Sequence, residues 1–234
     1  MTPSFYPETG HSQQHTNIDN HSLVSSSFTN RHSPQQTRPT LSRCLDYNAQ
    51  GPYLLWDVCE EPTASTVRLA DGSPIPDGFL QSAATSPPSR EMRIQCIWHA
   101  GWRPLSICIS IPSTTASPPG SPQYITVLMV IKEMHKYLQR KVTAAEFARF
   151  AAIPGEQDAV SKAFYARCER HFLQSSPGSR DMNREQADRE TQCGLRRVDC
   201  LRGHTVFRGL TASEDEEGLW HVRCTAAPWL PAHS

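Results

Sequence analysis

The chain contains eight cysteines, and no two of them are close enough in sequence to form the knuckle of a zinc site. Structural zinc sites usually take pairs of cysteines separated by about two to four residues. Four of the ten histidines lie in the first fifty residues, where ordering a polar segment would oppose metal binding. We therefore expect no metal and no cofactor. If Cys108 or Cys193 is exposed, its thiol could sense redox changes, and we keep this as one hypothesis for the function.

Two aspartates occupy positions that we expect to be ordered. Asp57 follows Trp56 in a predicted strand, and Asp199 lies within a second predicted strand. Together they could act as a general acid and a general base, provided that their environments make the pKa of one aspartate higher than that of the other. More often, an aspartate in a strand caps a turn or pairs with an arginine. We take Trp56, Asp57 and Asp199 as the candidate ligand-binding residues and predict no catalytic residue.

Motifs and charge exclude several other functions. The sequence has no glycine-rich phosphate loop, no nucleophile elbow, no HExxH motif and no kinase motifs. Its 23 basic and 23 acidic side chains balance, which argues against nucleic-acid binding. The longest apolar run, residues 125–131, is far shorter than the roughly 20 residues of a membrane helix. Without a signal-like N-terminus, we expect an intracellular protein, cytoplasmic or nuclear, with reduced thiols and no membrane partner.

Hydrophobic periodicity predicts strands on both sides of a central helical region. Apolar residues alternate with polar ones from Met92 to Trp98 and from Leu105 to Ile111, which predicts a hairpin with one buried face. A further strand is expected at residues 53–58, and a β-meander is expected at the C-terminal end, with strands at residues 197–201, 205–209 and 218–224.

Helical spacing of apolar residues begins at Val127 and continues to about Arg140. Thr143 and Glu146 have the spacing of a capping box, which predicts a second helix through about Ala152. A third helix is expected from Glu156 to Leu173. Because strands and helices segregate along the chain, the expected fold is α+β, with an antiparallel sheet packed against about three helices.

Polar composition marks the segments that we expect outside the core. Residues 1–50 are predicted to be a disordered tail, because they hold too few apolar residues to offset the loss of chain entropy. Residues 51–225 are expected to form a single α+β domain, with residues 174–194 as a flexible insert. Residues 226–234 complete the chain as a C-terminal tail.

Several short stretches occur in an order that resembles a fungal family. They are Leu54-Leu55-Trp56-Asp57-Val58, the Ser86-Pro87-Pro88 stretch before Met92, the Ile125-Thr126-Val127 start of a helix, and Arg197-Val198-Asp199 followed by residues 203–210 and Leu219-Trp220. Over residues 53–224 the chain resembles the basidiomycete family of unknown function 6699. The resemblance implies a fungal, intracellular protein with one α+β unit, and it implies no reaction.

These observations favour a non-enzymatic protein-interaction module, in which a sheet edge or a groove binds a protein or peptide partner. The competing hypothesis is an enzyme with an acid–base site near Trp56, Asp57 and Asp199. A pocket that holds convergent titratable groups would distinguish an enzyme from a binding module. The sequence leaves the partner and the oligomeric state open.

Overall fold

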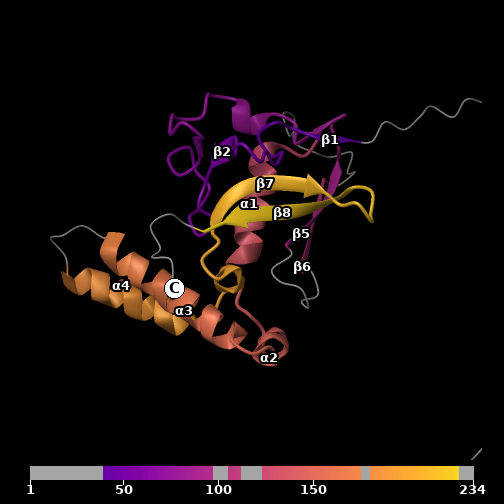
Figure 1. Cartoon of the computed structure of the whole chain (residues 1–234). Helices are drawn as coiled ribbons and strands as arrows, with labels where there is room; N and C mark the ends of the chain where they lie inside the picture. The colour runs from indigo at the N-terminus through magenta and orange to yellow at the C-terminus, as the bar shows by residue number, and fades with distance from the viewer. Residues whose placement is uncertain (1–38, 97–104, 112–122, 175–179, 227–234) are drawn as a thin grey trace, which may run out of the picture. The chain divides into compact units, whose positions relative to one another are not determined.

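The computed structural model describes residues 39–96, 105–111, 123–174 and 180–226 (Figure 1). All of these residues belong to one unit of the chain, Thr37–Ser234. The α-helices are α1 (Val127–Leu138), α2 (Ala144–Ala151), α3 (Glu156–Gln174) and α4 (Arg180–Cys193), and two short 3-10 helices are η1 (Phe79–Gln81) and η2 (Arg197–Leu201). The strands are β1 (Thr40–Leu41), β2 (Leu54–Leu55), β3 (Arg68–Leu69), β4 (Thr85–Ser86), β5 (Glu91–Cys96), β6 (Leu105–Ser110), β7 (Val206–Ala212) and β8 (Leu219–Thr225).

The main sheet has four strands in the order β6-β5-β8-β7. Strand β5 pairs with β6 antiparallel, as the alternating pattern predicts, and β7 pairs with β8 antiparallel, as expected of neighbouring strands in a meander. The two pairs join through β5 and β8, which run parallel. The predicted α+β class is confirmed. The parallel contact joins strands more than a hundred residues apart, so no local sequence pattern could indicate it.

Helix α1 packs against the main sheet, where it contacts β6 and crosses behind β7 and β8 in the view of Figure 1. Its predicted apolar stripe is buried, with Val130, Ile131 and Met134 fully excluded from solvent. These side chains share one core with the inward residues of β5 and β6. The helix begins where the Thr126 hydroxyl accepts a hydrogen bond from the Met129 N–H at 3.2 Å, which satisfies a donor that the first turn leaves unpaired.

The capping box predicted for α2 is confirmed. The Glu146 carboxylate accepts the Thr143 N–H at 2.8 Å, and the Thr143 hydroxyl accepts the Glu146 N–H at 3.2 Å. Helix α3 follows with Val160 and Cys168 buried, as its apolar spacing predicts. Among the described residues, no helix is long and apolar enough to cross a membrane.

Two predicted strands are wrong or shorter than expected. Residues 197–201 form the 3-10 helix η2, because the Asp199 carboxylate accepts the Arg196 N–H at 2.8 Å and folds the segment back. Of the strand expected at residues 53–58, Leu54–Leu55 pairs with β3. Residues 56–58 bond to the start of β7 instead, through an antiparallel bridge between Asp57 and Val206. The Asp57 carboxylate accepts the Cys59 N–H at 2.9 Å, which turns the chain out of the ladder.

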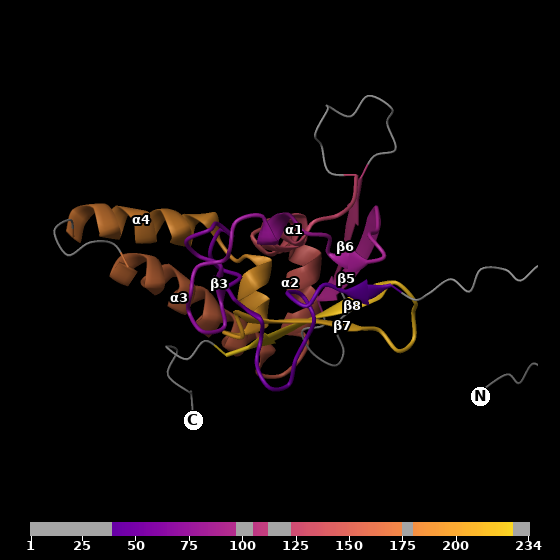
Figure 2. The same cartoon turned by 90° about the horizontal axis from the view of Figure 1, so that it is seen from above.

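The segment expected as a flexible insert, residues 174–194, contains helix α4, which packs along α3 (Figure 2). Its composition is polar throughout, so no apolar stripe marks it in the sequence. Polar contacts hold its C-terminal end instead, because the Glu190 carboxylate lies 2.7 Å from Arg167 of α3.

The domain begins earlier than residue 51. Thr40–Leu41 pairs with β4, and Leu45 is fully buried. The Leu45 carbonyl accepts the Leu210 N–H at 2.6 Å, and the Tyr47 N–H donates to the Leu210 carbonyl at 3.0 Å. Residues 39–50 therefore belong to the folded domain and not to the tail expected over residues 1–50. Residues 1–38 of that tail and residues 227–234 of the C-terminal tail lie outside the described residues.

Gly209 lies at a bulge in β7, with a φ of 122°, directly beneath residues 46–47. A Cβ atom there would lie 2.7 Å from the Tyr47 N and Cα atoms. We expect Gly209→Ala to lower the free energy of unfolding by about 3 kcal/mol, through backbone strain and this clash. Urea denaturation followed by circular dichroism measures the loss.

Gly218→Ala is the matched control, because Gly218 also has a positive φ, 73°, but nothing lies within 4 Å of the added methyl group. Gly218→Ala should lower the free energy of unfolding by only about 1 kcal/mol. Equal losses in the two variants would contradict the proposed contact between residues 46–47 and β7.

Candidate functional site

Trp56 is a core residue. Its side chain is 1% exposed and packs against Phe207, with the ring centroids 5.9 Å apart. The indole N–H donates to the Glu60 carbonyl at 3.0 Å. The ring face is packed and its only polar atom is satisfied, so the structure gives Trp56 a packing role.

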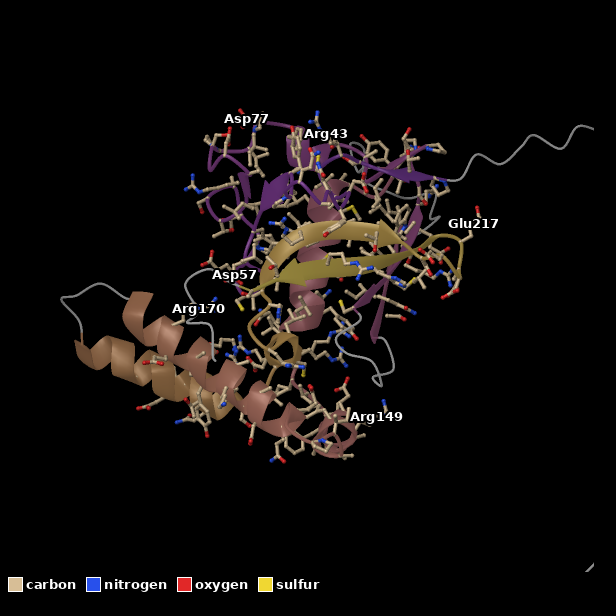
Figure 3. The ribbon with its side chains drawn as sticks, in the orientation of Figure 1. Arg43, Asp57, Asp77, Arg149, Arg170 and Glu217 are labelled. Atoms are coloured by element: carbon tan, nitrogen blue, oxygen red, sulfur yellow. The ribbon has the colours of Figure 1, made fainter. Side chains whose placement is uncertain are left out.

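Asp57 is joined to helix α3 by an ion pair. Its Oδ2 lies 2.7 Å from Nη1 of Arg170, and its Oδ1 accepts the Cys59 N–H. Asp57 is 7% exposed, and Figure 3 shows its side chain directed toward Arg170. Both carboxylate oxygens are therefore occupied by donors.

Asp199 makes a forked ion pair with Arg167, which comes from the same helix. Nε of Arg167 lies 2.7 Å from Oδ1, and Nη2 lies 3.0 Å from Oδ2. Both side chains are almost fully buried, at 4% and 1% exposure. Arg167 also donates to Glu190 of α4 at 2.7 Å and to the Gly194 carbonyl at 3.3 Å. Burial alone would lower the pKa of Arg167, but the hydrogen bonds and charge of Asp199 raise it.

Further arginines extend this network around η2. Arg196 contacts Glu190 at 2.9 Å and donates to the side chain of Gln139 at 2.7 Å. Arg197 pairs with Glu146 at 2.8 Å and stacks on the Tyr137 ring, 4.4 Å from its centroid. We call these ion pairs around η2 the η2 ion-pair network; its members are Arg167, Arg196, Glu190 and Asp199, together with the separate pair of Arg197 and Glu146.

Helix α3 brings the two predicted aspartates to neighbouring positions, because Arg167 and Arg170 are one helical turn apart. A cavity of about 20 Å³ lies there, lined in part by Cys59, Asp199 and Thr205. A cavity of this size holds about one water molecule. The arrangement of Asp57 and Asp199 can fix α3 against the sheet and η2. The space beside them is too small for a substrate.

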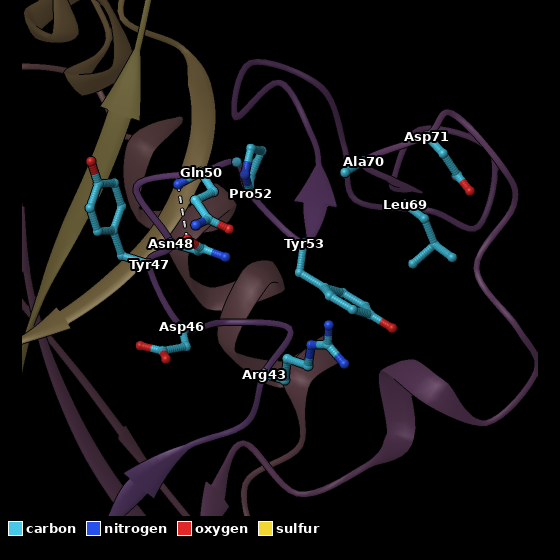
Figure 4. Close-up of a pocket in the computed structure, with 11 residues that line it drawn as sticks. Arg43, Asp46, Tyr47, Asn48, Gln50, Pro52, Tyr53, Leu69, Ala70 and Asp71 are labelled. Atoms are coloured by element: carbon cyan, nitrogen blue, oxygen red, sulfur yellow. Dashed lines mark hydrogen bonds between the residues drawn. The ribbon is translucent and has the colours of Figure 1, made fainter.

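A large cavity lies elsewhere, between the loop after β1, which we expected to belong to the tail, and residues 51–53 and 69–71 of the expected domain. It has a volume of about 810 Å³ and is open to solvent (Figure 4). The loop after β1 forms one side, and the β2–β3 pair forms the other. We call it the Arg43 groove; its lining residues are Arg43, Asp46, Tyr47, Asn48, Gln50, Gly51, Pro52, Tyr53, Leu69, Ala70 and Asp71.

Arg43 lies over the Tyr53 ring, with its guanidinium carbon 5.2 Å from the centroid (Figure 4). Tyr53 in turn stacks on Phe79 at 5.5 Å, which holds the ring in place. Within the described part of the chain, Arg43 makes no hydrogen bond or ion pair. Arg43 is exposed, so its donors are accessible from the groove. The arginines that do form ion pairs are Arg93, Arg167, Arg170, Arg189, Arg196, Arg197 and Arg202.

Two acidic residues outweigh the single positive charge of the groove. Asp46 and Asp71 line it, and the Asp46 carboxylate points away from Arg43 in Figure 4. The hydroxyl and N–H of Ser73 donate to Asp71 and lower the pKa of its carboxyl group, so Asp71 is ionised at neutral pH. The groove therefore offers one cation and two anions, a charge pattern that does not suit a polyanion.

The thiols divide into a large buried group and an exposed one. All eight cysteines are unpaired. Burial raises the pKa of the thiols of Cys96 and Cys200 to about 12, and it also raises the pKa of those of Cys44, Cys59, Cys168 and Cys224. These six thiols stay protonated at neutral pH and are poor nucleophiles. Cys108 is exposed and Cys193 is half-buried.

Metal-ligand geometry is not found in the part of the chain that the structure describes, where no three His, Cys, Asp or Glu residues lie close enough to hold an ion. The four N-terminal histidines lie outside the described residues. The fold and site therefore define an α+β domain with a buried ion-pair network and an open groove.

One known family accounts for most of this domain. The model of the Family of unknown function (DUF6699) matches residues 54–218, and the chain belongs to this family. No curated protein and no solved structure matches the chain significantly.

The sequence prediction found ordered aspartates but missed the Arg43 groove. Arg43 lies outside the matched residues and in a segment without apolar periodicity. No local signal marks it, because its environment depends on Tyr53 and on the contact of residues 45–47 with β7.

The contribution of the Arg167–Asp199 ion pair to the free energy of unfolding can be tested by substitution. Asp199→Asn leaves the Arg167 charge buried without its main partner, so we expect a loss of about 3 kcal/mol in the free energy of unfolding. The double variant Arg167→Met/Asp199→Leu should lose less than the sum of its two single variants, because it removes both charges together. Chemical denaturation of the wild type, Asp199→Asn, Arg167→Met, Asp199→Leu and the double variant measures these losses.

Arg93→Ala is the control for an exposed ion pair, since Arg93 and its partner Glu216 are both solvent-accessible. It should cost less than about 1 kcal/mol. An Asp199→Asn variant as stable as Arg93→Ala would show that the buried pair does not hold the helices.

Glu146 makes this network sensitive to acid. Desolvation opposes its ionisation, but the N–H and hydroxyl of Thr143 and the Arg197 guanidinium together lower its pKa below the usual value of 4.5. A lowered folded-state pKa contributes stability above the unfolded value, and this contribution is lost as the pH falls through the folded value.

We therefore expect Glu146→Gln to be less stable than the wild type by about 1 kcal/mol at pH 7. The difference should narrow as the pH falls from about 5 to about 3. Denaturation at a series of pH values measures it. A difference that stays constant over this range would show that the charge of Glu146 does not contribute.

Proposed function

We propose that this domain is a non-enzymatic protein-interaction module that binds an extended peptide segment of a partner protein in the Arg43 groove. The observation that carries the proposal is the Arg43 guanidinium, which lies over Tyr53 in an open groove of about 810 Å³ and forms no ion pair with the described residues. A carboxylate of the peptide would accept two hydrogen bonds from the exposed Arg43 guanidinium in place of solvent.

The groove has the dimensions of a ligand site, since such sites commonly have volumes of about 300 to 1,000 Å³. It also contains the residue types that dominate binding energy, because arginine and tyrosine are enriched at the energetic centres of interfaces. Tyr47 adds an aromatic ring that is 40% exposed. Asp46 and Asp71 favour a peptide that carries charges of both signs.

The alternative function, an enzyme with an acid–base site near Trp56, Asp57 and Asp199, has less support. A general acid or base must reach a proton on a substrate. Asp57 and Asp199 each give both oxygens to arginine or backbone donors, and Trp56 is buried. Ion pairs of this kind favour a structural role.

Eight unpaired cysteines support an intracellular location, cytoplasmic or nuclear, because disulfides are rare in reducing compartments. The resemblance described above supports a basidiomycete fungal origin. The balanced charge of the whole chain and the mixed charge of the groove support a protein partner over a nucleic acid.

A phage-displayed library of random peptides tests the proposal. Selection on the full chain should enrich peptides that share one Asp or Glu at a fixed position. Calorimetry with a synthetic selected peptide should show that Arg43→Ala weakens binding about tenfold, while Arg43→Lys retains part of the affinity. Changing the shared acidic residue of the peptide to its amide should have a similar effect on the wild type.

Arg149→Ala is the matched control, because Arg149 is an exposed arginine on α2, remote from the groove in Figure 3. It removes the same charge and should leave binding unchanged. The proposal is overturned if selection enriches no peptide above a blank surface, or if the selected peptides bind Arg43→Ala as tightly as the wild type.

A further inference from the structure

Strand β6 forms one edge of the main sheet. It pairs with β5 on one side, and among the described residues no strand pairs with its other side. The register places Ile111 opposite Arg90 at the end of the two strands. The Ile111 N–H donates to the Arg90 carbonyl at 2.9 Å, so these two residues form a hydrogen-bonded pair of the ladder. Because such pairs alternate along an antiparallel ladder, the N–H and C=O groups of Ser106, Cys108 and Ser110 point away from β5.

The side chains of these three residues are exposed, while Ile107 and Ile109 face the core beneath α1. The six residues of β6, Leu105–Ser110, include no charge, no proline and no glycine. Natural proteins usually protect an edge with charged side chains, proline or a covering segment. Within its described residues, β6 has none of these protections.

The opposite edge of the same sheet is covered. Residues 45–47 bond to Leu210 of β7 through two backbone hydrogen bonds, and Asp46 forms a parallel bridge with Leu210. The chain thus closes the β7 edge with its own backbone. The backbone groups on the outer side of β6 still require a partner strand or water.

We infer that the β6 edge pairs with the β6 edge of a second copy of this chain. The two strands run antiparallel about a two-fold axis at Cys108, and the two sheets join into one sheet of eight strands. In this register Ser106 opposes Ser110 of the other copy, and Cys108 opposes Cys108. Each copy then supplies acceptors and donors for the outward groups of the other.

The side chains at this edge are compatible with self-pairing. Opposed residues are small and uncharged, so the register brings no like charges together. On the exposed face, Glu91, Arg93 and Gln95 lie beside Ser110, Cys108 and Ser106 in the neighbouring strand. Because Glu91 and Arg93 carry opposite charges, the flanking strands of the two copies add no net repulsion. A lysine-rich partner strand or a polyanion carries charges of one sign, and it would be repelled by either Arg93 or Glu91.

The register makes a specific disulfide possible, which serves as a reporter. Hydrogen-bonded pairs in an antiparallel sheet have Cα atoms about 5.5 Å apart, within the range of about 4.4 to 6.8 Å that a disulfide spans. Treatment of the full chain carrying Cys193→Ser with diamide should form a covalent dimer. Two Cys108 thiols lose two protons and two electrons to the diamide, which is reduced to the hydrazine. Cys108→Ser should abolish the product.

The second arm tests the backbone pairing while keeping the thiol. Ser106→Pro removes an N–H that points away from β5, so the fold is retained, but the pairing with Ser110 of the second copy is lost. Its diamide-dependent dimer should fall at least about fivefold. Circular dichroism and urea denaturation check that the variant folds as the wild type does.

Sedimentation equilibrium without oxidant completes the experiment. The wild type should dimerise weakly, and Cys108→Lys should lower its association constant about fivefold or more, by placing two like charges at the axis. Ala212→Lys adds the same charge at the exposed end of β7 and should leave the association unchanged. A wild type that stays monomeric at high micromolar concentration, or a disulfide dimer that Ser106→Pro leaves intact, overturns the inference. Neither result bears on peptide binding in the Arg43 groove.

Discussion

The structure depends on burying the guanidinium of Arg167 together with the carboxylate of Asp199. Removing both charges from water is costly, and only a complete set of hydrogen bonds offsets the cost. Arg167 meets this condition through Asp199, Glu190 and Gly194. One side chain of α3 thereby holds η2 and the C-terminal end of α4. Helix α4 is too polar for apolar packing alone to fix its position, whereas η2 also packs through the buried side chains of Val198 and Cys200.

Sequence periodicity predicted the elements in which the order of apolar and polar residues within the element itself marks the buried face. Met92 and Ile94 alternate with polar neighbours, and Val130, Ile131 and Met134 recur at helical spacing, so each pattern states which face is buried. Helix α4 and η2 carry no such pattern. Their positions depend on ion pairs between residues 23 and 32 positions apart in sequence, and a single sequence does not reveal these partners.

The candidate site shows the same division. Asp57 and Asp199 were recognised as ordered acids, and both are held by arginines of α3. Arg43 was assigned to the predicted tail, because residues 43–50 are mostly polar and have no period. The groove exists only because Leu45 is buried and residues 45–47 bond to β7. That contact in turn requires Gly209, since any side chain at this position would collide with Tyr47.

Protection of one sheet edge therefore creates the groove. The backbone that covers β7 also places Asp46 and Tyr47 in the wall of the groove, opposite Tyr53. The unprotected edge, β6, lies at the other side of the sheet, three strand spacings of about 4.8 Å from β7. Pairing of two copies through β6 would leave both grooves open, one on each outer side of the joined sheet. A dimer of this kind would present two Arg43 grooves and could bind two segments of one partner, which raises the effective affinity without any new contact.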